Sequence, residues 1–353
     1  MRRSLLTLTI AVLLLVLRAP VQAEDLVLGL FGDYLDSLRI QASIPALSAA
    51  IIGDNGIFWE RAFGQQDVER SIATRSDTPF HLDGLTQVVT ASLVLRCVEE
   101  GSLSLEDRIS QFKPDSPDAN ATVRQLLTHT SGPADNLVFT YRPDRLDPLA
   151  AAIGACSGPS FRETLANLLE RLAMADSVPG ADIIHLAPPA EGIPTPAALA
   201  RYTSVLGRLA TPYAVDRQGR AVVSVHPATT ITPGGGLIST TRDFAKFDVA
   251  LRRGVLLRAE TLAAAWKPAV GRTGQALPHG IGWFVQTYNG EPVVWQFGVS
   301  DTASSSLVIK APRRGLTLIL LANGDGLVRS ASLASGDLTT SPVARLFLGT
   351  FLR

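Results

Sequence analysis

Short apolar or alternating runs of residues lie toward both ends of the 353-residue chain. They flank three stretches that favour tight turns, namely Asp54-Asn55-Gly56, Asn289-Gly290 and the segment 312–315. Strand-like runs on either side of an Asn-Gly or Pro/Gly turn are typical of β-hairpins. The pattern therefore predicts one hairpin early in the chain and two near its end.

The middle of the chain has the 3.6-residue spacing of apolar positions that is typical of helices. Helices are expected at 88–100, 123–127, 148–153, 161–174 and 196–209. A further helix should follow the triplet Ser239-Thr240-Thr241, which can cap it, and end at Gly254. The apolar stretch at 342–352 indicates a closing helix.

Strands from both ends and helices from the middle predict an α/β fold. Its antiparallel β-sheet is built from both chain ends and flanked by helices, with an all-helical domain inserted between them. We expect residues 24–80 and 225–353 to form the α/β part and residues 81–224 the mainly helical part.

The N-terminus has the pattern of a signal peptide covering residues 1–23. Arg2 and Arg3 precede an apolar run at 5–17, and Val21-Gln22-Ala23 fits a small-residue cleavage site. An uncleaved anchor is the alternative, but the run is short and ends at Arg18. No later segment has 18 uninterrupted apolar residues, so we expect no membrane span after cleavage and a periplasmic or secreted protein.

Charge and composition exclude several classes of function. The 32 basic and 32 acidic residues balance, which gives no reason to expect a nucleic-acid partner. The five histidines form no i, i+4 metal pair, and no glycine-rich phosphate loop follows a strand, so no metal or cofactor is expected. Both cysteines, Cys97 and Cys156, fall within helical patterns. An exported protein permits a disulfide, but buried free thiols are the expectation.

The stretch "HLDGLTQVV", residues 81–89, is unusual because Gly84 stands where the first turn of a helix should form. Glycine is a poor helix former. The chain also lacks a Gly-x-Ser-x-Gly nucleophile elbow. Neither helical propensity nor a standard nucleophile motif explains this glycine.

Nearly the whole chain after residue 23 resembles the serine β-lactamase and penicillin-binding protein family. The likeness is greatest to class C β-lactamases and to related esterases and D-alanyl-D-alanine peptidases. Six segments carry the resemblance, in the order of the family: "IPALSAAIIGDNGIFWERAFGQQDVE", "LRCVEEGSLSLEDRISQF", "VRQLLTHTSG", "GGGLISTTRDFAKF", "HGIGWFV" and "SSSLVIKAPRRGLTLILLANGD".

The resemblance implies three catalytic elements, and each is altered here. In the Ser-x-x-Lys element, Gly84 stands at the position of the serine nucleophile and Gln87 at the position of the lysine. The Tyr-x-Asn element maps to Tyr141 and Pro143. The Lys/His-x-Gly strand element maps to Gln296 and Gly298. A literal Ser-x-x-Lys at 110–113 lies in a connecting loop before a proline, which makes one-turn stacking of serine and lysine unfavourable.

The joint loss at these positions predicts a catalytically inactive pseudoenzyme or a ligand-binding protein. The resemblance places the oxyanion-hole N–H groups at Gly84 and Val299, and a ligand site would comprise Gly84, Gln87, Tyr141, Gln296, Gly298 and Val299. It would hold a peptide, an acyl compound or a cell-wall-derived small molecule. The alternative is a serine hydrolase, of β-lactamase, esterase or D-alanyl-D-alanine carboxypeptidase type, with a non-standard nucleophile. The candidate nucleophiles are Thr86, Ser131 and Ser300.

Overall fold

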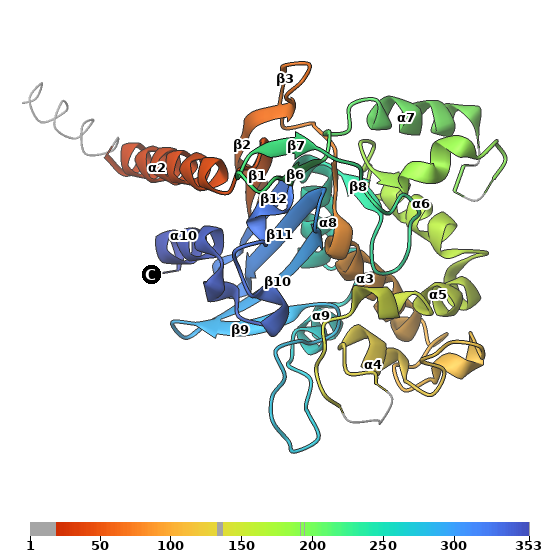
Figure 1. Ribbon diagram of the computed structural model, residues 1–353. Helices are drawn as coiled ribbons and strands as arrows, with labels where there is room; N and C mark the ends of the chain where they lie inside the picture. The colour runs from red at the N-terminus through yellow and green to blue at the C-terminus, as the bar shows by residue number, and fades with distance from the viewer. Residues whose placement is uncertain (1–18, 133–136, 191, 194, 353) are drawn as a thin grey trace, which may run out of the picture.

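A seven-stranded antiparallel sheet forms the centre of the protein (Figure 1). The computed structural model describes residues 19–132, 137–190, 192–193 and 195–352. The sheet has the order β3-β2-β1-β12-β11-β10-β9. Its strands are β1 (Ala46–Gly53), β2 (Gly56–Asp67), β3 (Ile72–Ala73), β9 (Phe284–Tyr288), β10 (Glu291–Ser300), β11 (Ser304–Ala311) and β12 (Leu316–Ala322). Strand β1 pairs with β12, so the two ends of the chain meet in the middle of the sheet.

All three predicted hairpins are present. The β1–β2 hairpin turns at residues 54–55, the β9–β10 hairpin at Asn289-Gly290, and the β11–β12 hairpin at residues 312–315. Asn289 and Gly290 both have positive φ, as a two-residue hairpin turn requires. The α/β class and the sheet built from both chain ends are thereby confirmed.

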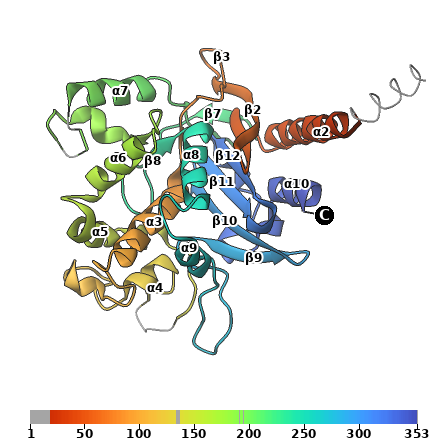
Figure 2. The same ribbon diagram turned by 180° about the vertical axis from the view of Figure 1, so that it is seen from behind.

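Helices cover both faces of this sheet (Figures 1 and 2). The terminal helices α2 (Ala19–Gln41) and α10 (Pro342–Phe351) contact each other and share one apolar core with the sheet. Helix α8 (Thr241–Arg252) lies on the other face, and α9 (Ala259–Ala265) follows it. Thr240 caps α8 as expected, because its side chain accepts a hydrogen bond from the Asp243 N–H. Gly254, just past the helix end, has the positive φ expected of a C-terminal cap.

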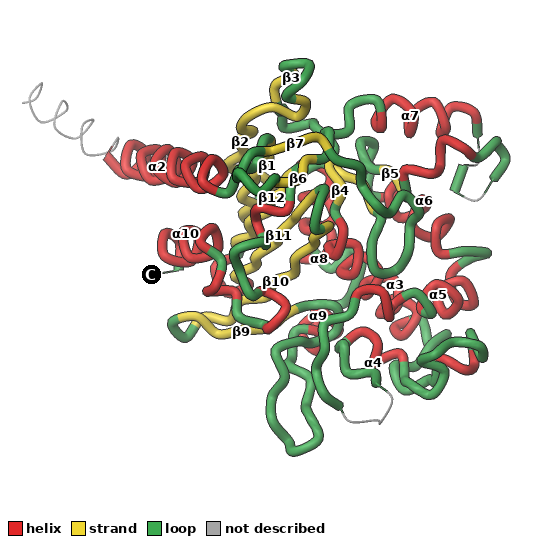
Figure 3. Tube along the Cα trace, viewed as in Figure 1, coloured by secondary structure: helices red, strands yellow, loops and turns green. Residues whose placement is uncertain are grey.

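The middle of the chain forms the helical side of the molecule, which Figure 3 shows in red beside the central strands. Its helices are α3 (Thr86–Glu99), α4 (Val123–Leu127), α5 (Leu149–Ser157), α6 (Phe161–Arg171) and α7 (Pro196–Leu206). Short strands join it to the rest: β4 (Phe80–His81), β8 (Leu237–Ser239) and β5 (Val178–Pro179) make one small sheet, and β6 (Tyr213–Val215) pairs with β7 (Ala221–Val223).

The expectation of free thiols is wrong. Cys97 on α3 and Cys156 on α5 form a disulfide that closes a loop with a sequence separation of 59. Helical periodicity places each cysteine on a helix, but it does not reveal that the two helices pack side by side. The disulfide ties α5 to the helix that begins at the altered catalytic motif.

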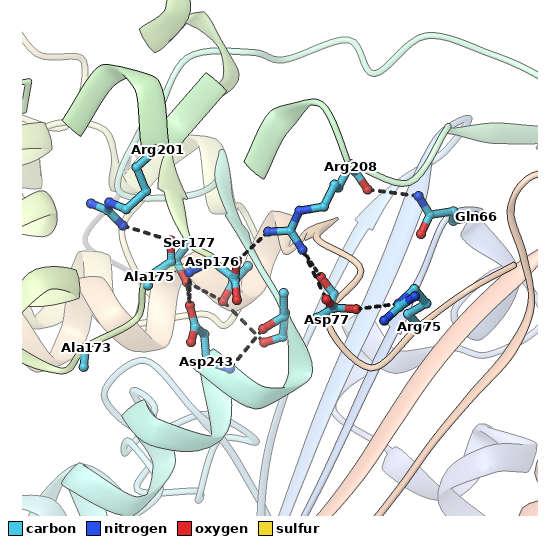
Figure 4. A network of polar contacts seen from close by, with 12 residues as sticks. Gln66, Arg75, Asp77, Ala173, Ala175, Asp176, Ser177, Arg201, Arg208 and Asp243 are labelled. Atoms are coloured by element: carbon cyan, nitrogen blue, oxygen red, sulfur yellow. Dashed lines mark hydrogen bonds and ion pairs between the residues drawn. The ribbon is translucent and has the colours of Figure 1, made fainter. Parts of the chain in front are cut away.

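Polar side chains connect the helical side to the α/β side (Figure 4). Arg208 forms ion pairs with Asp176, at 2.5 Å, and with Asp77 on the segment before β4, at 3.5 Å. The Asp243 carboxylate at the start of α8 accepts hydrogen bonds from the Asp176 N–H and the Ser177 hydroxyl. These contacts fix the helical side against the sheet whose strands carry part of the candidate site.

The expected signal peptide falls largely outside the described residues, since the description begins at residue 19. The described chain starts in α2, which projects from the body of the molecule (Figures 1 and 2). Within the residues that can be described, no helix combines the length and the apolar character needed to cross a bilayer.

Candidate functional site

Gly84 lies where the chain passes from β4 into α3, in the short 3₁₀ turn Asp83–Leu85. This turn packs against β10 of the central sheet. A β-carbon at Gly84 would stand 2.5 Å from the carbonyl oxygen of Phe297 and 2.9 Å from the Tyr141 hydroxyl oxygen. Both distances are shorter than side-chain packing permits. The position where the family's nucleophile would begin is therefore filled by neighbouring oxygens.

Gly298, the residue after Phe297 on β10, also lies directly against this turn. A β-carbon there would lie 2.3 Å from the Leu82 carbonyl oxygen and 2.5 Å from the Gly84 nitrogen. The Ser306 hydroxyl on β11 donates to that same Leu82 carbonyl at 2.6 Å. Two glycines thus allow the backbone of the turn to lie directly on β10, and the sheet holds it there.

Gln87, one turn further along α3, is fully buried and bonded at both ends of its amide. Its Nε2 donates to the Tyr141 hydroxyl at 2.8 Å, and its Oε1 lies 2.9 Å from Nε2 of His129. An amide oxygen only accepts, so the His129 Nε2 must carry the proton of this hydrogen bond. Gln87 therefore bridges two groups that a lysine ammonium could not satisfy in the same way.

His129 is a neutral imidazole with both ring nitrogens engaged. Its Nδ1 accepts a hydrogen bond from the Arg142 N–H at 3.2 Å, while its Nε2 faces Gln87. Burial lowers the pKa of His129 to about 3, and the Asp144 carboxylate opposes this only in part. Neither nitrogen is left to accept a proton from a nucleophile.

Tyr141 and Gln296 continue the same hydrogen-bond network to the sheet. The Tyr141 hydroxyl proton faces two acceptors, the Gln296 Oε1 and the Phe297 carbonyl, each at 3.2 Å. Burial raises the pKa of this phenol, which keeps it protonated. The Gln296 Nε2 donates to the Gly282 carbonyl and to His279, whose Nδ1 in turn donates to the Gly280 carbonyl. Burial lowers the pKa of His279 well below its ordinary value.

The residues predicted from the family motifs are thus brought together, but as a closed and uncharged network. Its five side chains are His129, Gln87, Tyr141, Gln296 and His279. The two histidines have no counterpart in the sequence prediction. His129 meets Gln87 from 42 residues away and His279 meets Gln296 from 17 residues away, and neither separation is a spacing that helix or strand periodicity would predict.

A second polar cluster, also absent from the sequence prediction, lies beside Gly84. Asp83 has a positive φ of 47° and binds His226 Nε2 at 2.8 Å through one carboxylate oxygen. Its other oxygen accepts a hydrogen bond from Ser304 at 2.7 Å. The His81 ring stacks on that of His226, and burial with this neighbour lowers the pKa of His81 to about 4. Because Asp83 separates Ser304 from His226, the imidazole is not bonded to a serine it could activate.

The remaining predicted positions surround these clusters. The Pro143 carbonyl lies against Gly234, so closely that a β-carbon at Gly234 would be 2.2 Å away. Val299 follows Gly298 on β10 and is partly exposed, as is Tyr141. In the part of the chain that the structure describes, no group of three His, Cys, Asp or Glu side chains could hold a metal ion.

Comparisons with known proteins agree with this architecture. The sequence profile of the Beta-lactamase family matches residues 31–336. Penicillin-binding protein 4* of Bacillus subtilis (strain 168) is 24% identical over 304 residues, covering 76% of this chain and 65% of that relative. The chain thus spans slightly less than two thirds of that protein's length.

Two solved structures share the fold. The octameric penicillin-binding protein homologue from Pyrococcus abyssi has a TM-score of 0.71 at 20% identity, covering 91% of this chain and 77% of that one. The penicillin-binding protein from Bacillus halodurans has a TM-score of 0.64 at 19% identity, covering 82% and 94%. With the profile match spanning most of its length, the chain belongs to the Beta-lactamase family.

Proposed function

We propose that this protein is an exported, non-acylating member of its family, a pseudoenzyme in which the former catalytic centre has become a structural polar network. One observation carries the proposal. The space of a side chain at residue 84 is occupied by the Phe297 carbonyl and the Tyr141 hydroxyl. A serine at this position would have no room for its β-carbon, and the glycine present offers no attacking atom.

The chemistry of the neighbouring groups supports the same proposal. Loss of a serine nucleophile alone costs roughly a millionfold in kcat. Gln87 cannot act as a base, and both nitrogens of His129 are engaged. No group of this network combines a free lone pair with a pKa near neutrality, which general-base catalysis requires.

The three alternative nucleophiles have little support from their surroundings. The Thr86 hydroxyl accepts a hydrogen bond from the Leu237 N–H and is fully buried. Ser131 is close to His129 in sequence, but the partners of that ring are Gln87 and Arg142. The Ser300 hydroxyl is buried and has no hydrogen-bond partner among the described residues, so no base activates it.

A second candidate function is non-covalent binding of a peptide, an acyl compound or a cell-wall-derived small molecule. Tyr141 and Val299 favour it because both keep some exposed surface at the edge of the network. Gln87 and Gln296 are fully buried, so a ligand at this edge would contact Tyr141 and Val299 before either amide. Calorimetry with D-alanyl peptides, muropeptides and β-lactams tests this candidate, and a Val299→Trp variant that blocks the edge should abolish any heat.

Covalent labelling tests the principal proposal. Purified protein lacking residues 1–23 should form no adduct with a fluorescent penicillin or a fluorophosphonate, as judged by intact mass and in-gel fluorescence. A catalytically competent family member in the same assay serves as the positive control. A stoichiometric adduct would overturn the proposal, and peptide mapping would then identify the nucleophile.

The exported location rests on the signal-peptide pattern and is supported by the Cys97–Cys156 disulfide, because disulfides persist in oxidising compartments. N-terminal sequencing of protein recovered outside the cytoplasm should begin at Glu24. Recovery of chains that retain residues 1–23 would contradict this cleavage.

A further inference from the structure

The outer edge of β2 lacks a strand partner along most of its length. Strand β3 pairs only with Gln65 and Asp67, at the end of β2. Among the described residues, no group outside β1 forms a hydrogen bond with the backbone of residues 57–63. An unpaired edge of this kind presents a row of N–H and C=O groups to an extended chain.

The register of β2 shows which of its backbone groups face outward. The Gly64 carbonyl accepts a hydrogen bond from the Thr74 N–H at 3.0 Å, so the backbone of Gly64 faces away from β1. In an antiparallel pair, every second residue turns its N–H and C=O groups to the same side. The register with β1 is unbroken from residue 59 to residue 64. The N–H and C=O groups of Ala62 and Glu60 are therefore open to a further strand.

A groove of about 660 Å³ lies between this edge and α8, and it offers accessible apolar surface. Phe58, the extra residue of a β-bulge where the register with β1 shifts, is 44% exposed. Val255, just past α8, is 59% exposed, and Ile57 and Val249 are partly buried. The two walls are thus the end of β2 and one side of α8, which lies in front of the sheet in Figure 2.

The rim of the groove carries three cations, Arg242, Lys246 and Arg253, and one carboxylate, Glu60. The Arg242 Nε donates to Glu60 at 2.9 Å, and Lys246 pairs with a carboxylate of α8 itself. Arg253 has no ion-pair partner among the described residues, and its Nη2 lies 3.5 Å from the Asp54 carbonyl oxygen. The positive charge of Arg253 is therefore available to an acidic partner.

We propose that β2 and this groove bind an extended, acidic segment of a partner protein by strand addition. The segment would continue the sheet through the backbone of Glu60 and Ala62, cover the exposed Phe58 and pair a carboxylate with Arg253. Edge-to-edge pairing of two copies of this chain would bring two cationic rims together, which disfavours a second copy as the partner. The site does not rest on the proposed loss of acylation, because its residues lie outside the network around Gly84.

A capped peptide, Thr-Glu-Thr-Val-Thr-Val-Thr-Glu-Thr, places its glutamates and valines on one face when it is extended. Two matched peptides separate the contributions of charge and backbone. One has glutamine in place of both glutamates, and the other has N-methylvaline in place of both valines, which removes two N–H donors. Calorimetry with the purified protein should show binding of the parent peptide. The N-methylated peptide should bind roughly tenfold more weakly, and the glutamine peptide up to about fivefold more weakly.

Two variants of the protein test the groove itself. Arg253→Gln should weaken binding of the parent peptide up to about fivefold and leave binding of the glutamine peptide unchanged. Phe58→Ser should weaken binding of both, because it removes exposed apolar surface from the groove. Arg272→Gln is the matched control, since Arg272 is exposed and has no ion pair within the described chain. It should leave binding of every peptide unchanged.

Circular dichroism and thermal melting establish that each variant is folded. No heat with the parent peptide, or equal binding of the parent and N-methylated peptides, would overturn the proposal. Equal binding of the parent and glutamine peptides would overturn its acidic character. Analytical ultracentrifugation tests the second copy as the occupant. Self-association that is lost in the Phe58→Ser variant would assign the groove to a contact between copies and would likewise overturn the proposal.

Discussion

The carbonyl oxygen of Phe297 lies 2.5 Å from the point where a β-carbon on Gly84 would be placed. This single approach links the strand that carries the third family motif to the turn that carries the first. It also gives Gly84 a structural role. Gly84 lacks an attacking hydroxyl, and together with Gly298 it also allows β10 and the turn before α3 to come into contact.

Restoring the family residues should consequently fail to restore acylation. Gly84→Ser combined with Gln87→Lys places a side chain against backbone atoms that the sheet holds in position. We expect no labelling by a fluorescent penicillin and a loss of stability, measured by urea unfolding. Labelling of the double variant would mean that the turn and β10 separate easily, which would contradict the tight contact described above.

The single substitution Gly84→Ala isolates the packing effect. It should lower the free energy of unfolding by about 1–3 kcal/mol, the usual cost of overpacking a rigid site. Gly349→Ala on α10 is the matched control, because nothing lies within 4 Å of the added β-carbon. Alanine is the better helix former, so this control should be neutral or stabilising by up to about 1 kcal/mol.

Most of the fold follows from local patterns, whereas the packing of the site does not. Asn289-Gly290 fixes a hairpin through its own backbone preference, and Thr240 caps α8 within three residues. By contrast, the contact of Gln87 with His129 spans 42 residues, and that of Asp83 with His226 spans 143. Such contacts depend on how separate helices and strands pack together. The hydrophobic pattern of one element does not indicate which other element lies against it. The family resemblance located Gly84, Gln87, Tyr141 and Gln296, but not the two histidines that complete their network.

Gln87→Leu should be strongly destabilising although it keeps an apolar, helix-compatible side chain. It removes the acceptor of the His129 Nε2–H and the donor to the Tyr141 hydroxyl. Each buried group left without a partner costs about 1–3 kcal/mol. Urea unfolding measures the loss, and the exposed Gln218→Leu, expected within about 0.5 kcal/mol of the wild type, is the control. Equal stability of the two variants would show that the network is not structural.

Removing the disulfide should cost about 4 kcal/mol, because the bond between Cys97 and Cys156 restricts a long loop of the unfolded chain. The double variant Cys97→Ala and Cys156→Ala should unfold at lower urea concentration, and the reduced wild type should match it. Since the chain has two cysteines in all, thiol titration of the native oxidised protein should find none free. Two titratable thiols in unreduced protein would contradict the pairing.

Stability should fall as the pH drops below neutrality. The pKa of His129 is about 3 in the folded protein, against 6.5 for an ordinary histidine, so between these values the unfolded chain binds a proton that the native state does not. This group therefore lowers the free energy of unfolding by up to about 1.4 kcal/mol per pH unit as the pH falls from 6.5 toward 3. His81, with a pKa of about 4, acts in the same direction.

The variant His129→Asn tests the sign of this pH dependence, because asparagine tolerates the positive φ of this position and does not titrate. Urea unfolding at pH 7, 6 and 5 should show a shallower decline for the variant than for the wild type. Parallel declines would mean that His129 takes up its proton without unfolding, which the hydrogen bonds at both of its ring nitrogens oppose.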